Sequence, residues 1–443
     1  MTNPAYHVPY GRGQLAFDLP AGLTGRVLES HSVPALADPV AAVTIALKSP
    51  VAGPCLAALA RPGNRVTIVV TDSTRACPDH LLVPPVVAEL LDAGVARADI
   101  TIVVGIGLHR PSTPAEWIEK LGPEIAGLLR IVNPEPTNPA ALVDLGMTAE
   151  GVPAIVCRGV VEADLVVATG IVEPHQYAGY SGGRKTVAIG AGGELTIQVS
   201  HGMAMLEHPG VRLGRIDGNP FHAAITEIAR RAGLRFVVNA VLNDAGQVVA
   251  VAAGEPDATL RHLVAFAERL FTIDIAGPAD VVVAGVGHPK DANLYQASRG
   301  ASYLCFAPTP VVRRGGVIVL PARAEEGVGT GLGERRFHEL MRSANSPAEL
   351  IDDARRNGYP AGGQRAVVMA KVLEHCQVIV VGAAEPALVR DLKMLPVATM
   401  AEALDLAQST VGGSPERPAS AYVIPHALLT LPIVRAPVAG SGQ

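Results

Sequence analysis

One segment of the chain gathers side chains that are suited to chemistry. Residues 173–186 read Glu-Pro-His-Gln-Tyr-Ala-Gly-Tyr-Ser-Gly-Gly-Arg-Lys-Thr and include His175 and Lys185, and His201 follows downstream. Imidazole exchanges protons near neutral pH and binds nickel, copper or zinc. An ordinary core helix or strand does not need this mixture. It predicts a loop that holds a charged cofactor and a metal, with acid/base groups beside it.

The glycine-rich part of this segment predicts a phosphate cradle, because glycine lets backbone N–H groups approach an anion and nearby cations supply charge. The predicted cofactor-binding residues of this segment are Ser181, Gly182, Gly183, Arg184 and Lys185, and Asp72, further upstream, is predicted to bind the cofactor with them. The spacing is not that of a Walker A loop. A glycine-rich turn with solvated charges is the alternative interpretation, and Lys185 could also be a nucleophile or a covalent tether.

Six short runs of Val and Ile predict strands buried on both faces, over 65–72, 99–105, 163–170, 279–285, 315–320 and 376–382. Apolar residues at helical spacing predict helices over 83–93, 220–232, 258–270 and 364–374. This alternation predicts an α/β fold with parallel-rich sheets flanked by helices. We expect an N-terminal domain over 1–275, joined by the tail 407–443, and a C-terminal α/β domain over 276–406 that closes over the substrate.

Polar candidates follow the predicted strands at their carboxyl ends, where open parallel sheets bind ligands. Asp72 and Arg75 follow the first strand, His109 the second and His175 the third, while residues 285–290 follow the fourth. This convergence predicts an active site in an interdomain cleft. A lone loop histidine is more often structural, but two at matching positions favour acid/base catalysis.

Guanidinium groups clamp carboxylates with paired hydrogen bonds, which makes Arg75 and Arg299 candidate substrate ligands. Tyr295 and Gln296 lie one helical turn before Arg299 and are predicted to bind the substrate with it. Surface salt bridges are the alternative for both arginines. His201 fits no zinc motif, so it would be a weak metal site unless a bound cofactor supplied the other ligands.

Composition excludes several classes of protein. Apolar residues make up 49% of the 443 residues and charged residues 17%, and the net charge of −5 without a basic run argues against nucleic-acid binding. The five cysteines form no CxxC pair, which is typical of a reducing compartment. No run is long enough to span a membrane and no signal peptide is recognisable, so we expect a cytoplasmic protein.

The strings Gly-Leu-His-Arg at 107–110 and Glu-Pro-His-Gln-Tyr-Ala-Gly-Tyr-Ser-Gly-Gly-Arg-Lys at 173–185, together with His201, resemble the lactate racemase family. The resemblance runs from about Asp72 to Tyr359. It implies a nickel-pincer nucleotide, which maturation enzymes make and which Lys185 can tether covalently. It also implies that His201 binds nickel.

The resemblance further implies that His109 and His175 are the acid/base pair and that Arg75 and Gln296 contact the substrate. Arg299 stands where the lactate enzymes often have lysine, and Tyr359 stands where they have tryptophan near the substrate. Residues 188–194 replace a Leu-Pro-Gly-Ile sequence. These differences leave the cofactor role intact and put the substrate in question.

We therefore expect a racemase or epimerase that inverts C2 of a small 2-hydroxyacid by removing and returning a hydride. One alternative is the same cofactor with a sugar-acid or dicarboxylate substrate. A second is a non-catalytic protein that binds the nickel nucleotide. A third, a zinc hydrolase, is disfavoured because His201 alone looks like a protein metal ligand. The oligomeric state is not predicted.

Overall fold

The computed structural model describes residues 6–435, and the chain divides into two compact units. One, here called the central unit, contains residues 32–211 and 215–270. The other, the terminal unit, contains residues 1–31, 212–214 and 271–443, of which 1–5 and 436–443 are not described. Each unit has its own sheet and its own hydrophobic core.

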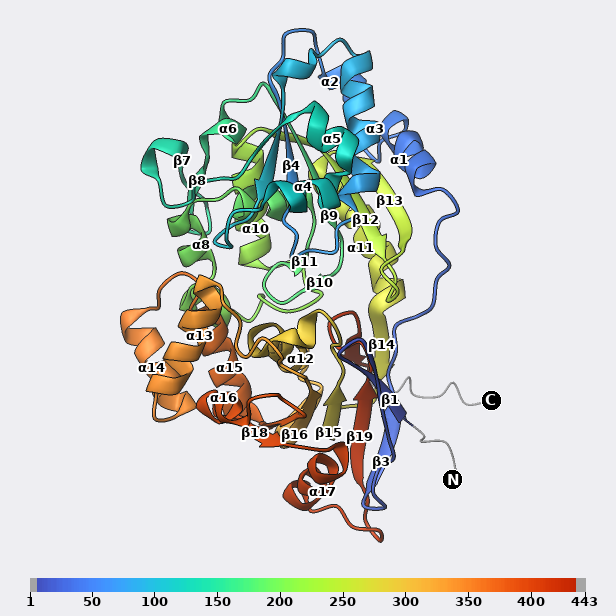
Figure 1. Cartoon of the computed structure of the whole chain (residues 1–443), viewed down its shortest axis with the longest axis vertical. Coiled ribbons are helices and arrows are strands. Elements are labelled where there is room, and N and C mark those ends of the chain that lie inside the picture. Colours follow the sequence, from blue (N-terminus) through green and yellow to red (C-terminus); the bar gives the residue numbers. More distant parts are fainter. Residues whose placement is uncertain (1–5, 436–443) are drawn as a thin grey trace. The chain divides into compact units, whose positions relative to one another are not determined.

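The central unit contains a six-stranded sheet in the order β13-β12-β9-β4-β5-β6 (Figure 1). β13 pairs with β12 in antiparallel orientation, and the other pairings are parallel. The strands are β4 (Val66–Thr71), β5 (Ile100–Gly105), β6 (Arg130–Val132), β9 (Leu165–Ile171), β12 (Leu234–Leu242) and β13 (Val248–Gly254). All seven residues of β9 are buried, as the uninterrupted apolar run predicts.

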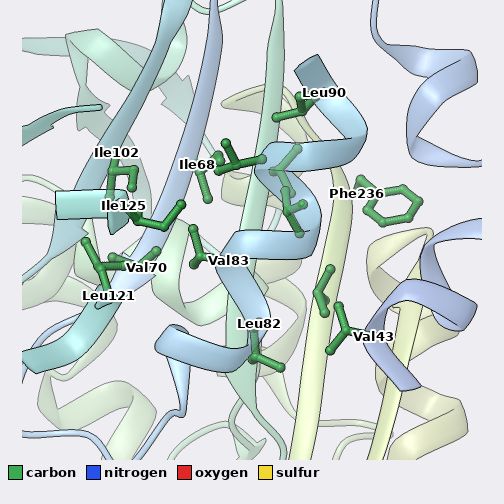
Figure 2. Packing of buried hydrophobic residues seen from close by; sticks show 14 of the residues in the cluster. Val43, Ile68, Val70, Leu82, Val83, Leu90, Ile102, Leu121, Ile125 and Phe236 are labelled. Atoms are coloured by element: carbon green, nitrogen blue, oxygen red, sulfur yellow. The ribbon is translucent and has the colours of Figure 1, made fainter. Parts of the chain in front are cut away.

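Helices cover both faces of this sheet. Ile68 of β4 and Phe236 of β12 pack with helices α1 (Pro39–Lys48), α3 (Asp79–Asp92), α4 (Pro114–Leu121) and α5 (Pro123–Leu128) in one core cluster (Figure 2). On the opposite face, α7 (Gly183–Lys185) lies against Ala168 and Val237. Burial of each such Val, Ile or Leu side chain contributes about 1.5–3 kcal/mol.

The remaining elements of the central unit are short, apart from two longer helices. The hairpins are β7–β8 (Leu142–Met147, Pro153–Cys157) and β10–β11 (Pro174–His175, Gly179–Tyr180). A π-helix spans Thr186–Gly190. The helices are α2 (Leu56–Leu59), α6 (Arg158–Val161), α8 (Glu194–Ser200), α9 (Met203–Glu207), α10 (Pro220–Arg231) and α11 (Pro256–Phe271), with 3-10 turns at Arg97–Asp99 and Pro139–Ala141.

The terminal unit contains a second six-stranded sheet, in the order β18-β17-β16-β15-β19-β3, and every pairing in it is parallel. Its strands are β3 (Leu23–Val27), β15 (Ala279–Ala284), β16 (Val312–Pro321), β17 (Gln377–Val381), β18 (Leu395–Val397) and β19 (Ala419–Ile424). Small sheets are formed by β1 (Tyr6–Tyr10) with β2 (Gly13–Phe17) and by β14 (Thr272–Ile275) with β20 (Leu431–Val434).

Helix α17 (Met400–Val411) packs on one face of this second sheet through Ala403, Leu404 and Ala407. The helices are α12 (Leu294–Cys305), α13 (Leu332–Ser343), α14 (Pro347–Asn357), α15 (Gln364–His375), α16 (Pro386–Asp391) and α17 (Met400–Val411), with a 3-10 turn at Lys290–Ala292. Within residues 6–435, none of the helices combines the length and apolar character that crossing a membrane requires.

The α/β fold class and all six predicted strands are confirmed, but the predicted domain boundaries need correction at both ends of the chain. The N-terminal strand β3 pairs with β19, and β20 of the predicted tail 407–443 pairs with β14. Both ends therefore belong to the unit that begins again at Phe271, not to the predicted domain 1–275. Neither β3 nor β20 is among the predicted strands, and a local pattern does not show with which distant strand a segment will pair. Residues 436–443 of that tail lie outside the described residues.

Candidate active site

Two of the predicted site residues form a hydrogen-bonded pair at the carboxyl edge of the central sheet. β4 and β5 are neighbours in register, so the residues that follow Thr71 and Gly105 emerge at the same edge. There, His109 Nδ1 lies 2.5 Å from Asp72 Oδ2. The Asp72 side chain is 4% exposed and that of His109 40% exposed. The carboxylate is thus buried behind an imidazole that reaches the surface of the unit.

The surroundings of Asp72 favour its ionised form. Burial raises the pKa of its carboxyl, but the hydrogen bond and charge of His109, the charge of Arg75 and the Thr74 hydroxyl outweigh burial and lower that pKa to about 2. Thr74 Oγ1 donates to Asp72 Oδ1 at 2.7 Å. Asp72 was predicted to bind the cofactor; the structure places it as the partner of His109, and a direct role toward a nucleotide remains a prediction.

A buried polar cluster supports the loop that carries Asp72 and Arg75. Lys120 Nζ of α4 donates to the carbonyl oxygens of Arg75 and Cys77, at 2.9 and 2.8 Å, and forms an ion pair with Asp79 at 3.2 Å. Asp79 is fully buried and also accepts hydrogen bonds from the hydroxyls of Thr71 and Thr169, which lie on β4 and β9. This cluster fixes the backbone from which the predicted substrate arginine extends.

His175 is held by a tight hairpin. It ends β10, and β11 begins at Gly179, so residues 176–178 form the connecting turn. The backbone N–H groups of Tyr177 and Ala178 both donate to His175 Nδ1, at 3.2 and 3.1 Å. The side-chain amide of Asn219 donates to the Tyr177 carbonyl at 2.8 Å and anchors the turn to the start of α10.

The lysine segment lies on the carboxyl edge of the same sheet at very short range. An added Cβ on Gly170 of β9 would lie 2.6 Å from the nitrogen of Gly183, and one on Gly190 would lie 2.9 Å from the Cα of Gly105. Glycine is needed at these contacts because the backbones of strand and helix touch there. Lys185, at the end of α7, is half-buried.

Two predicted phosphate ligands make contacts that favour a structural role. Ser181 Oγ donates to the carbonyl of Ile171 at 2.6 Å and so closes its own loop. Arg184 is 1% exposed, and its Nη1 donates to Thr226 Oγ1 at 2.6 Å and lies 3.2 Å from His222 Nε2, both on α10. An arginine buried in this way packs α7 against α10. Binding of phosphate by Ser181, Gly182, Gly183 and Arg184 remains a prediction.

His201 follows α8 in an aromatic environment. Its ring lies 4.9 Å from that of Tyr177 and 5.0 Å from that of Phe221, measured between centroids. Its Nδ1 lies 3.0 Å from the carbonyl of Ile197, which can only accept, so the proton belongs on Nδ1 and the lone pair on Nε2. Burial, followed by the charge of Lys185, lowers the pKa of His201 to about 4. A neutral imidazole of this kind is the form that binds a metal.

The predicted substrate residues lie in the terminal unit. Tyr295, Gln296 and Arg299 share helix α12, where Arg299 donates to Tyr303 at 2.7 Å and to Gln296 at 3.4 Å. Tyr359 lies between α14 and α15. Another guanidinium, that of Arg365 on α15, donates to Ser302 at 2.9 Å and lies 5.7 Å from the centre of the Tyr295 ring.

Three side chains that contact the backbone or side chains around the candidate site could not be selected from the sequence. Lys120 lies in a short amphipathic helix and resembles a surface lysine, Asn219 resembles an ordinary helix cap, and Arg365 begins a helix without any motif. The only available signal for Asn219 was its place before Pro220. Their contacts depend on elements that are distant in sequence.

The arrangement defines an α/β protein with a carboxylate–histidine pair, a second fixed histidine, and a neutral imidazole beside a lysine. Within residues 6–435, no group of three or more His, Cys, Asp or Glu side chains could hold a metal ion together. A metal bound through His201 would therefore need ligands from a bound cofactor.

Comparison with known proteins identifies the family. Residues 10–214 match the model of the lactate racemase N-terminal domain, and residues 275–429 match that of the lactate racemase C-terminal domain. The chain is 30% identical over 387 residues to a lactate racemase of Lactiplantibacillus plantarum, covering 86% of this chain and 88% of that protein. The protein belongs to the lactate racemase family.

Two further relatives agree with this assignment. A lactate racemase of Thermoanaerobacterium thermosaccharolyticum is 28% identical over 409 residues, covering 91% of this chain and 94% of that protein. The solved structure of the lactate racemase apoprotein from the same organism superposes with a TM-score of 0.86, over 98% of this chain and all of that one, at 28% identity. A Thermotoga maritima protein shares the fold at 18% identity, with a TM-score of 0.66 over 91% of this chain and all of that one.

Proposed function

We propose that this protein is a racemase or epimerase that inverts C2 of a 2-hydroxycarboxylic acid with the help of a nickel-pincer nucleotide. The observation that carries the proposal is the presence of two differently anchored histidines, His109 on Asp72 and His175 on its hairpin, with the His201 ring 4.9 Å from the Tyr177 ring in the turn of the same hairpin. A protein that only stored a nucleotide would have no use for such a pair. The names of the relatives make lactate the first substrate to test.

The residues present fit the proposed cofactor. His201 carries its lone pair on Nε2 and is neutral, as a nickel ligand must be. Lys185 is half-buried, and its charge contributes, after burial, to the lowered pKa of His201. When bound, the nucleotide would supply a reversible acceptor for the C2 hydrogen as hydride, which protein side chains cannot supply.

The protein's own residues then orient the substrate and move its hydroxyl proton. Arg75, whose backbone is fixed by Lys120, binds the substrate carboxylate. His109 takes the hydroxyl proton at Nε2, and the Asp72 carboxylate stabilises the resulting imidazolium. His175 contacts the C2 oxygen of the opposite enantiomer. The planar keto acid that forms between these steps must turn before the hydrogen returns to its other face.

One observation favours a larger or more highly charged substrate as a second candidate. Arg365 reaches both Tyr295 and Ser302, which lie on either side of Arg299 along α12, and so adds a second guanidinium to the same helix face. Two guanidiniums suit a dicarboxylate or a sugar acid better than lactate. Tyr359 in place of tryptophan is consistent with a differently shaped pocket.

The test is production of the full chain together with the cofactor maturation enzymes, followed by nickel analysis and a panel of 2-hydroxyacids monitored for loss of optical purity. We expect bound nickel and inversion of at least one acid of the panel. His109→Gln and His175→Gln should each abolish inversion and retain nickel. Nickel binding without inversion of any acid would instead identify a nickel-nucleotide binding protein, and retained inversion in both variants would refute the acid/base assignment.

A further inference from the structure

The hydrogen bonds around His175 determine which of its ring nitrogens carries a proton. Nδ1 receives two backbone N–H groups, those of Tyr177 and Ala178, at 3.2 and 3.1 Å. A backbone N–H can only donate, so Nδ1 must offer its lone pair. In the neutral ring the proton then belongs on Nε2. A proton added to Nδ1 would break both of these hydrogen bonds.

The turn that supplies these N–H groups is fixed. Asn219 is 3% exposed and donates to the carbonyls of both Tyr177 and Arg215, at 2.8 and 2.9 Å. Gly179, which follows the turn, has a φ of +74°, and a Cβ there would lie 2.0 Å from the Arg215 carbonyl oxygen. The Tyr177 ring packs against Phe221 at 5.5 Å between centroids. These contacts hold the turn in place, so His175 Nδ1 remains an acceptor.

The environment of His109 imposes the opposite arrangement. Its Nδ1 faces Asp72, whose second oxygen already accepts from Thr74. An ionised carboxylate can only accept, so the proton of His109 belongs on Nδ1. The lone pair of the neutral ring is then on Nε2. Nε2 of neutral His109 therefore carries a lone pair, whereas Nε2 of neutral His175 carries a proton.

We propose that the acid/base pair is preset unequally, with His109 offering a proton acceptor and His175 a hydrogen-bond donor at Nε2, and with Asp72 and Asn219 as the positioning residues. What this difference between the two histidines means for catalysis rests on the proposed racemase function. A hydroxyl that faces His109 can give up its proton directly. An oxygen that faces His175 instead receives a hydrogen bond, and His175 can accept a proton only after Nδ1 has lost its backbone donors.

The test is nuclear magnetic resonance of the full chain without nucleotide, labelled with nitrogen-15 in histidine. Protonated ring nitrogens and those with a lone pair resonate in separate regions, and His109→Gln and His175→Gln variants assign the signals. At neutral pH we expect a protonated Nε2 with an unprotonated Nδ1 in His175, and a protonated Nδ1 in His109. Finding one shared tautomer, or a doubly protonated His175, would overturn the proposal.

A variant of Asn219 tests the positioning role. Asn219→Ala removes the anchor of the turn, and we expect His175 to become a mixture of tautomers while His109 is unchanged. The matched control is Asn243→Ala, which removes a buried asparagine from the β12–β13 turn and should leave both histidines unchanged. An unchanged His175 in Asn219→Ala would remove Asn219 from the proposal. Because no nucleotide is present, the result is independent of whether racemisation is found.

Discussion

Replacing Lys120 by methionine should destabilise the protein strongly, although the residue looks like a surface lysine in the sequence. The side chains of Lys120 and Asp79 are 11% and 0% exposed, and their charged atoms are 3.2 Å apart. Methionine keeps the length of the chain but leaves the Asp79 charge buried without this cation. Breaking such a pair costs about 3–5 kcal/mol. The hydroxyls of Thr71 and Thr169 still donate to Asp79, which favours the lower end of that range.

Urea denaturation gives the free energy of unfolding for this comparison. The control is Arg65→Met, because the Arg65–Asp164 pair is 3.6 Å long with side chains 63% and 44% exposed, and its loss should cost less than about 1 kcal/mol. In the double variant Lys120→Met/Asp79→Asn the buried charge is absent, so part of the lost stability should return. The argument is refuted if Lys120→Met costs no more than Arg65→Met. In loaded enzyme, Lys120→Met should also raise KM more than it lowers kcat, because Arg75 loses its backbone support.

Three further predictions test other parts of the site. The pKa of Asp72 is about 2 in the folded protein against an ordinary value of 3.8. The ionised carboxylate therefore stabilises the fold by about 2 kcal/mol above about pH 4, and this contribution is lost as the pH falls toward 2. In Asp72→Asn, the free energy of unfolding should change less with pH across that window. His201→Ala should lose nickel on desalting of the matured protein, whereas His262→Ala, at an exposed position of α11, should keep it; equal retention would exclude His201 as the ligand. Gly179→Ala should lower the melting temperature by several times the effect of Gly151→Ala. Both glycines have a positive φ, but a Cβ at 179 would collide with the Arg215 backbone, whereas a Cβ at 151 meets nothing within 4 Å. Equal shifts in calorimetry would contradict the close contact with Arg215.

Local patterns predicted the strands and the loops that carry the site. β4, β5 and β9 are continuous apolar runs, and His109 and His175 follow their carboxyl ends as expected. The order β9-β4-β5 is what brings the following loops to one edge of the sheet. Sheet order is a non-local property, so the pairing of Asp72 with His109 was not foreseen, although both residues were selected.

Other expectations depended on the direction in which side chains point. The string from Ser181 to Lys185 has the composition of an anion-binding loop, yet Arg184 is directed into the interface between α7 and α10. Composition alone does not distinguish a cation that faces a ligand from one that holds two helices together. Lys120 and Asn219 were missed for a related reason, because a polar residue in an amphipathic segment is normally solvated.

The pairing of β3 with β19 bears on how the chain is made. β3 (Leu23–Val27) is synthesised long before β19 (Ala419–Ile424), the strand with which it pairs. The central unit, by contrast, is nearly continuous in sequence and can fold while synthesis proceeds. Until β19 emerges, an incomplete sheet edge stays available to other nascent chains, which is a hazard for aggregation. Overproduction should therefore profit from chaperones that shield β3 until β19 has been made.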